Sequence, residues 1–541
     1  MENIRFVLIV ILSMISLMLW EAWQVDYGPK PETTAQQTVI DSNGNLVPVT
    51  GSNSDGSSEL PFLESAANSI ITVTTDVYHL EIDTKGGTLR NLDLLDYPFE
   101  KGEPAPVRLL DGSSEKLFLG QSGLISSPES ATLPNHNVQL HAEQYSYELK
   151  AGENTLSIPL TWTDNNGLSY SKTYTFTRGS YAIQVAQKVD NQSTKDWSGR
   201  PYTQLLRVPY SDGQGNTFIR TFAGAVVYTE EEKFQKIEFE DMADVDLKVT
   251  STGGWTGMIQ HYFAAAWIPP VGNEQHFFTK ELSNSRYVIG SYPNPTTVAA
   301  NSNAVFNSQL FVGPKIQPMM EALAPGLELT VDYSWLTIVG KPIYSLLNFI
   351  HDFVKNWGFS IMGVTFCIKL LFFPLSAASY KSMAKMRKLQ PRLAQLKESY
   401  GDDRQKFNEE MMSLYRKEKV NPMGGCLPVI VQIPVFISLY WVLIETVELR
   451  QAPFLFWVQD LSSKDPYFVL PVLMGISMFI QQRLNPAPVD PLQAKIMRMF
   501  PIVFTVFFLF FPSGLVLYWV TNNTLSIIQQ WYITRKIVGT D

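Results

Sequence analysis

The pattern of apolar and polar positions divides the chain into two unlike halves. From about residue 68 to 315, β-branched and aromatic residues alternate with polar ones, and Gly-Gly and Asn-Gly pairs stand at the breaks. This alternation is typical of antiparallel strands joined by tight turns. From about 335 to 536, long apolar runs are interrupted by one basic block, which is typical of membrane-spanning helices. We therefore predict a large β-sandwich at 61–330 and a helical membrane region after it.

The first 60 residues predict a membrane anchor and a tether. Arg5 precedes an uninterrupted apolar stretch from Phe6 to Trp20, and the residues that follow are bulky rather than small. A cleaved signal peptide is the alternative, but it needs small residues at the cleavage site, so we expect an uncleaved anchor at 1–23 with Arg5 inside. Residues 24–60 are rich in Ser, Thr, Gly and Asn, which predicts a flexible periplasmic linker.

The second half predicts one interfacial helix and five spans. Within 331–358, apolar residues recur on one helical face between flanking lysines. This suits a helix lying in the outer membrane interface, and an amphipathic helix packed on the sandwich is the alternative. Together with the anchor, six transmembrane helices leave both termini in the cytoplasm, and Lys and Arg concentrate in the loops expected inside. The expected spans are 359–379, 423–444, 466–482, 499–511 and 515–533.

The basic block at 380–422 has a helical pattern of its own. Its apolar residues are spaced three and four apart on both sides of Gly401-Asp402-Asp403, which predicts a cytoplasmic helical hairpin. A solvated loop is the alternative. As a docking arm, the hairpin would present positive charge to lipid head groups or to ribosomal RNA. The residues expected to carry this charge are Lys381, Lys385, Arg387, Lys388, Arg392 and Lys417.

Lys369 is the candidate functional residue of the membrane half. It lies among bulky apolar residues near the middle of its predicted span, where a charge costs roughly 3 kcal/mol on insertion scales. Snorkelling to the interface is the alternative, but we expect a water-filled groove, with Pro374 bending the helix below it. The other polar residues expected to line this groove are Thr365, Gln432, Trp519 and Asn522.

Several classes of function find no support in the sequence. The net charge of −9 arises mainly in the polar half, so it does not indicate nucleic-acid binding. There is no phosphate-binding G-x-x-x-x-G-K-[ST], no H-E-x-x-H and no G-x-S-x-G, so we predict no enzyme activity, no cofactor and no metal. Both cysteines, Cys367 and Cys426, lie outside the predicted sandwich, which therefore has no disulfides. A sugar-binding site on the sandwich remains an alternative to a structural role.

Specific stretches carry a resemblance to a known family. The runs "SMAKMRKLQPRL", "EEMMSLYRKEKVNPMGGCLPVIVQIPVF", "VELRQAPF" and "FPIVFTVFFLFFPSGLVLYWVTN" resemble the YidC-type membrane protein insertases of the Oxa family, in their Gram-negative form. The resemblance implies a polytopic α-helical protein whose five-helix core surrounds a hydrophilic groove, with a periplasmic β-sandwich similar to the sugar-mutarotase-like superfamily. It also implies a positive residue in the groove at the position of Lys369, where many members carry arginine.

The resemblance further implies a function and partners. The protein would insert nascent membrane proteins into the bacterial inner membrane and help them fold, alone or with a Sec-type translocon in the phospholipid bilayer. Some members bind ribosomes through a long basic tail, and since this chain ends in "ITRKIVGTD", a weak ribosome contact would fall to the hairpin. A small-anion transporter or channel that binds its ion at Lys369 is the alternative from another class, and a plain anchor for a sandwich enzyme is a third.

Overall fold

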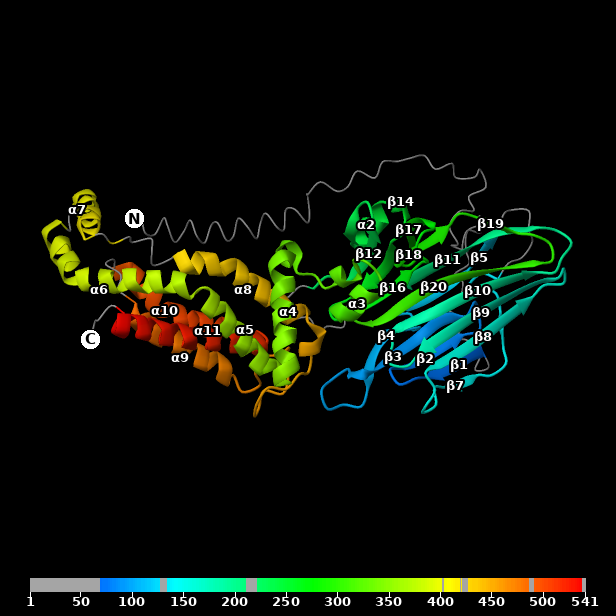
Figure 1. Cartoon of the computed structure of the whole chain (residues 1–541), viewed down its shortest axis with the longest axis horizontal. Helices are drawn as coiled ribbons and strands as arrows, with labels where there is room; N and C mark the ends of the chain where they lie inside the picture. Colours follow the sequence, from blue (N-terminus) through cyan, green and yellow to red (C-terminus); the bar gives the residue numbers. More distant parts are fainter. Residues whose placement is uncertain are drawn as a thin grey trace. The chain divides into compact units, whose positions relative to one another are not determined.

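The computed structural model describes residues 69–126, 134–210, 221–400, 403–418, 420, 427–485 and 491–537. The chain divides between Val331 and Asp332 into a β-rich unit and a helical unit (Figure 1). The predicted anchor, the linker, the start of the predicted third span and the last four residues lie outside the described residues.

The β-rich unit contains two large sheets (Figure 1). The first has the order β14 (Lys248–Thr252), β17 (Glu274–Leu282), β18 (Arg286–Pro293), β11 (Trp197–Arg207), β5 (Phe118–Ser126), β3 (Thr88–Pro98), β2 (Tyr78–Asp83), β1 (Ile70–Thr74), β7 (Ser146–Glu148), with β19 (Thr296–Val298) beside β11 and β4 (Pro106–Leu110) beside β3. The second has the order β13 (Lys233–Ile237), β12 (Gly224–Thr229), β15 (Trp255–Ile259), β16 (Phe263–Ile268), β20 (Ser302–Pro314), β10 (Ala182–Asn191), β9 (Leu168–Thr177), β8 (Thr155–Thr163), β6 (His141–Ala142). The short helices α2 (Phe239–Asp244), α3 (Gln317–Leu323) and η2 (Leu327–Thr330) complete the unit.

Pairing within the described sheets is antiparallel, as the turn signals predicted, with one exception. Strands β1 and β7 pair in parallel. Side chains of β9 and β10 alternate between buried and partly exposed positions, as a period of two requires for strands with one face in the core. In contrast, β15 and β16 are buried at every position, with Trp255 and Trp267 among the largest buried side chains.

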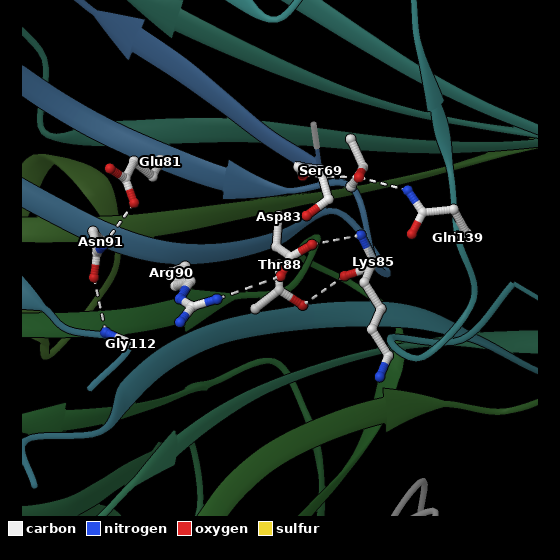
Figure 2. A network of polar contacts seen from close by, with 10 residues as sticks. Ser69, Glu81, Asp83, Lys85, Thr88, Arg90, Asn91, Gly112 and Gln139 are labelled. Atoms are coloured by element: carbon white, nitrogen blue, oxygen red, sulfur yellow. Dashed lines mark hydrogen bonds and ion pairs between the residues drawn. The ribbon is translucent and has the colours of Figure 1, made fainter. Parts of the chain in front are cut away.

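The turn between β2 and β3 is held by a network of polar contacts (Figure 2). Asp83 Oδ1 accepts from the Lys85 amide at 2.9 Å, and the hydroxyl of Thr84 donates to the Ser69 carbonyl at 2.8 Å. At the tip, Gly86 has φ +69°, and a Cβ there would overlap the backbone of His136. Glycine is therefore required at Gly86 both by the backbone conformation and by the close approach of another segment.

Lys172 joins the two sheets from inside the sandwich. Its side chain is fully buried on β9, and its ammonium donates to the Gly86 carbonyl at 2.6 Å and the Ser122 carbonyl at 2.8 Å. The hydroxyl of Tyr174 donates to the neighbouring Gly87 carbonyl. Because burial disfavours the charged form, the pKa of Lys172 falls to about 7.

The helical unit contains α4 (Thr337–Val354), α5 (Trp357–Leu371), α6 (Phe373–Tyr400), α7 (Arg404–Lys417), α8 (Leu427–Glu445), α9 (Val469–Leu484), α10 (Pro491–Phe508) and α11 (Ser513–Tyr532), with short turns η3 (Ser334–Leu336), η5 (Val447–Leu449) and η6 (Ile533–Ile537). Helix α11 packs against α5 and α9, and α9 packs against α10. Among the described residues, no individual helix has both the length and the apolar character of a membrane span, whereas α5 and α6 satisfy both requirements as a pair bent by 67°.

One expected helix is broken in the structure, and another lies where the sequence predicted it. The expected span at 359–379 is broken at Phe372, two residues before Pro374. Proline disfavours helical geometry in the residue that precedes it, so a break that close to Pro374 is consistent with its expected effect. Helix α4 coincides with the expected amphipathic helix: Ile343 and Leu347 are buried, while Phe349 and Phe353 are largely exposed.

Candidate functional site

The helical unit contains a partly open cavity of about 380 Å³. It is lined by side chains from α5, α6, α8, α9, α10 and α11, and four of the five predicted groove residues are among them: Lys369, Gln432, Trp519 and Asn522. None of the described lining residues is an aspartate or a glutamate. The charge of Lys369 therefore faces amide, hydroxyl and apolar groups and no opposing carboxylate.

Lys369 lies in the last turn of α5 and is only 6% exposed. Its Nζ donates to Ser526 Oγ at 2.8 Å, and that hydroxyl donates to the Asn522 carbonyl one turn earlier in α11 at 2.7 Å. The side chain of Gln529 also reaches the Lys369 carbonyl at 3.3 Å. Helix α11 thus contacts both the backbone and the ammonium of Lys369.

Ser526 was not among the residues predicted from the sequence, although a signal for it exists. Trp519, Asn522 and Ser526 are spaced three and four apart, which places them on one face of a helix. Asn522 also accepts from Gln432 Nε2 at 3.1 Å, joining α8 to α11. A chain of polar contacts therefore crosses from α8 through α11 to Lys369.

Thr365, the fifth predicted groove residue, does not line this cavity. It is 1% exposed, and its hydroxyl donates to the Ile361 carbonyl of its own helix at 2.7 Å. Its hydrogen-bonding capacity as a donor is therefore used within α5.

Trp519 carries a buried donor that the fold leaves unused. Its ring lies 4.8 Å from that of Phe436 and 5.8 Å from that of Phe508, measured between centroids. Its Nε1 is buried without a hydrogen-bond partner among the described residues. An unpaired buried donor is costly, so this N–H can bind a polar group that enters the cavity.

Apolar side chains form one side of the cavity. Ile433 of α8 and Phe500 of α10 both line it, and their side chains are 44% and 48% exposed. Met383, Met478 and Met497 also contribute to the lining, and unbranched methionines adapt to apolar partners of differing shape. The cavity therefore combines polar side chains with exposed apolar side chains from α8 and α10.

The loop 446–468, which we name the capping loop, lies against the N-termini of α5 and α11. Asn356 Nδ2 donates to the Phe454 carbonyl at 3.2 Å, and the amides of Ser513 and Gly514 donate to carbonyls of the loop at 2.7 and 2.9 Å. Within the loop, Asp460 Oδ1 accepts from the amides of residues 451 and 462 at 3.0 and 2.8 Å. The loop is therefore tied both to itself and to two helices of the site.

Gly358 provides a test of how firmly the capping loop is seated. A Cβ at Gly358 would overlap the ring of Phe454, so Gly358→Ala should displace the loop and speed hydrogen exchange of the amides bound to Asp460. Gly363→Ala is a matched control on the same helix, because its Cβ would meet only side-chain carbons of Ile350, at 3.1 Å or more, and no part of the loop. Equal exchange in the two variants, measured by mass spectrometry, would contradict the tight seating.

The basic residues predicted for docking lie on a pair of packed helices. Helices α6 and α7 share a small apolar core that contains Leu389, Leu393 and Tyr415, and Arg392 forms an ion pair with Glu418 at 2.6 Å. The predicted cationic residues are all exposed: Lys381, Lys385, Arg387, Lys388, Arg392 and Lys417. On the described residues no group of His, Cys, Asp and Glu side chains is arranged to hold a metal ion.

Comparisons with solved structures yield only weak likenesses. A crystal structure described as an active YidC insertase with the first transmembrane domain resolved is 17% identical, with 86% of this chain and 93% of that chain covered and a TM-score of 0.39. A galactose mutarotase-like protein from Lactobacillus casei is 10% identical, with 45% and 99% covered and a TM-score of 0.32. Scores at this level do not establish a shared fold, so the mutarotase-like fold of the sandwich stays a prediction.

Comparisons of sequence are far stronger. The family model of the YidC periplasmic domain matches residues 70–346, and that of the 60Kd inner membrane protein matches 349–540. The membrane protein insertase YidC of Methylococcus capsulatus is 55% identical over 543 residues, and that of Nitrosococcus oceani is 49% identical over 544, with 99% of both chains covered in each case. With matches that extend over nearly its whole length, this chain belongs to the YidC family of membrane protein insertases.

Proposed function

We propose that this protein inserts nascent membrane proteins into the bacterial inner membrane and assists their folding. The observation that carries the proposal is the cavity at Lys369, where a buried ammonium lies among polar side chains and exposed apolar side chains of α8 and α10. Relatives about half identical over their whole length are named membrane protein insertases, which supports the assignment.

The polar interior suits the flank of a substrate that must cross the membrane. A short acidic or polar segment entering the cavity would meet the ammonium of Lys369, the amides of Gln432 and Asn522, and the free N–H of Trp519. Each contact replaces part of the hydration that the segment loses, and desolvation of polar groups is the main cost of crossing a bilayer. The cavity thereby lowers the barrier without covalent chemistry or a cofactor.

The apolar side suits the hydrophobic segment that follows the flank. This segment would slide along the exposed apolar residues of α8 and α10, such as Ile433 and Phe500, and pass into lipid. Burial of its surface contributes about 25 cal/mol per Å². The membrane potential adds a driving force on acidic flanks that move outward.

The orientation that fits this mechanism is the one predicted from the sequence. Six transmembrane helices would leave both termini in the cytoplasm, the sandwich and the capping loop in the periplasm, and the α6–α7 pair in the cytoplasm. Its exposed lysines and arginines would then contact anionic lipid head groups and, weakly, a translating ribosome, while a Sec-type translocon would be a lateral partner. The family model named for a periplasmic domain supports the placement of the sandwich.

The capping loop argues against a small-anion transporter or channel. Such a protein needs a path through the bundle, whereas the loop is hydrogen-bonded to α5 and α11 at one end of it. A groove accessible from one side and from lipid is what an insertase requires. No contact in the helical unit indicates a second gate among the described residues.

The decisive experiment reconstitutes the purified full chain into liposomes and adds a labelled single-spanning substrate with an acidic flank. Protection of the translocated flank from added protease, above the level in empty liposomes, is the expected result. A parallel measurement of anion efflux tests the transporter. Efflux without insertion would overturn the proposed function.

A further inference from the structure

The contact between Lys369 and Ser526 defines how the ammonium is presented to the cavity. Both side chains are buried, at 6% and 2% exposed, and their residues are separated by 157 positions in the sequence. Among the described residues, the 2.8 Å contact with Ser526 Oγ is the hydrogen bond that Lys369 Nζ makes within the protein. No carboxylate in the described lining competes for the ammonium.

The hydroxyl of Ser526 can act towards Lys369 only as an acceptor. A serine hydroxyl has one hydrogen and two lone pairs, and here the hydrogen is donated to the Asn522 carbonyl at 2.7 Å. An oxygen lone pair is therefore presented to the ammonium, which has no acceptor capacity of its own. Tyr380, which also lines the cavity, shares a side-chain hydrogen bond with the same hydroxyl. The direction of each bond in this chain is fixed by chemistry alone.

The same helix also holds the other end of Lys369. Gln529 Nε2 donates to the Lys369 carbonyl, one of the carbonyls in the last turn of a helix that lack an intrahelical partner. Held at its backbone and at its tip, the side chain has little freedom to extend towards either end of the bundle. Three N–H groups belong to an ammonium, so one directed to Ser526 leaves two for the cavity.

We propose that Ser526 is a positioning residue, which holds the Lys369 ammonium over the cavity with two N–H donors free to bind an acidic flank of the substrate. This inference deepens the proposed insertase function and rests on it for the identity of the bound group. The hydroxyl is a neutral acceptor, so it fixes the position of the ammonium and leaves its positive charge in place. A carboxylate partner would instead neutralise that charge. A single acceptor also suits the compact ammonium of lysine better than the planar fork of arginine.

The test compares three variants of the full chain in proteoliposomes. Ser526→Ala removes the acceptor, and Ser526→Thr keeps a hydroxyl at the same position. Thr524→Ala is the matched control, because Thr524 donates to the Val520 carbonyl at 2.8 Å in the same way on the same helix but is exposed. It therefore loses an equivalent helix contact away from the cavity.

The first measurement reports on Lys369 without reference to activity. Reductive methylation of Lys369, followed in its own peptide by mass spectrometry, should become about tenfold faster in Ser526→Ala, because a hydrogen bond to a charged group is lost. Ser526→Thr and Thr524→Ala should methylate at the rate of the unchanged protein. Equal rates in Ser526→Ala and Thr524→Ala would overturn the positioning role.

The second measurement compares insertion of two substrates that differ only in an acidic or a neutral flank. Ser526→Ala should reduce insertion of the acidic-flank substrate selectively, and Ser526→Thr should restore it. An equal loss for both substrates would mean that Ser526 serves only to stabilise the bundle and would also overturn the proposal. The two measurements can also disagree. If methylation changes as expected but neither the unchanged protein nor any variant inserts either substrate, the positioning role of Ser526 stands and the proposed insertase function fails.

Discussion

Replacing Lys369 by glutamate should reduce insertion of an acidic-flank substrate by at least about tenfold, because attraction becomes repulsion. Two unit charges 4 Å apart interact by about 4 kcal/mol at an effective dielectric constant of 20, and a tenfold change in rate needs only about 1.4 kcal/mol. Lys369→Arg keeps the charge and should retain most of the activity. The measurement is the protease-protected fraction of substrate in proteoliposomes containing each variant.

A charge exchange sharpens this test. A substrate with a basic flank should be inserted poorly by the unchanged protein and better by Lys369→Glu, since the variant reverses the charge of the cavity. Lys355→Glu is a suitable control because Lys355 is an exposed lysine beside α5 that does not line the cavity. Normal insertion of acidic-flank substrates by Lys369→Glu would show that the electrostatic role is wrong.

The sandwich should become more stable as the pH rises from about 7 to 9. Burial lowers the pKa of Lys172 to about 7 from its ordinary value of 10.5, so within this range the unfolded chain binds more protons at this site than the folded one. Stability must then increase with pH, by up to about 1.4 kcal/mol per pH unit. Below pH 7 lysine is charged in both states, and the full cost of burying the charge remains.

The titratable groups near Lys172 do not change their protonation between pH 7 and 9. Burial raises the pKa of Tyr174 and Tyr202 well above the ordinary value of a tyrosine, so both stay neutral below pH 10. His136 beside them has a pKa lowered to about 4, first by burial and then by the charge of Lys172, and it is neutral throughout.

Lys172→Met isolates the effect. Between pH 7 and 9, the urea concentration at the unfolding midpoint of the sandwich should rise in the unchanged protein and rise much less in this variant. The midpoint is measured by pulse proteolysis of the full chain, in which the fragment that contains the sandwich is followed. Lys188→Met is the control, because Lys188 lies on the neighbouring strand β10 but is only partly buried. If Lys172→Met kept the slope of the unchanged protein, Lys172 would not be the titrating group.

The elements of this protein were predictable where one local pattern decides them. The period of two along 168–177 predicted a strand with one buried face, and β9 has that alternation. The apolar runs that became α8, α9 and α11 were predictable for the same reason, because a helix or a strand depends mainly on neighbours within a few positions. The resemblance identified the family, and the sequence comparisons confirm it.

The arrangement of the site depended on contacts that no local pattern contains. Lys369 and Ser526 are 157 positions apart, so the sequence indicated an expensive charge but not its acceptor. Thr365, although one turn from Lys369 in the same helix, is satisfied by its own backbone and does not line the cavity. Only the packing of α11 against α5 determines that Lys369 finds an acceptor on another helix, whereas Thr365 donates within its own.

The same distinction applies to the sandwich. Lys172 occupies an inward position between Tyr170 and Tyr174, which the alternation alone places in the core. A lysine is tolerated at this position because its ammonium reaches the carbonyls of Gly86 and Ser122. These residues are separated from Lys172 by 86 and 50 positions in the sequence, respectively. The sequence by itself determined the alternating strands, the apolar helical runs and the family, because these follow from local periodicity and shared motifs. Only the tertiary structure decided which buried charges have acceptors, because the free energy of a buried charge depends on groups brought to it from distant parts of the chain.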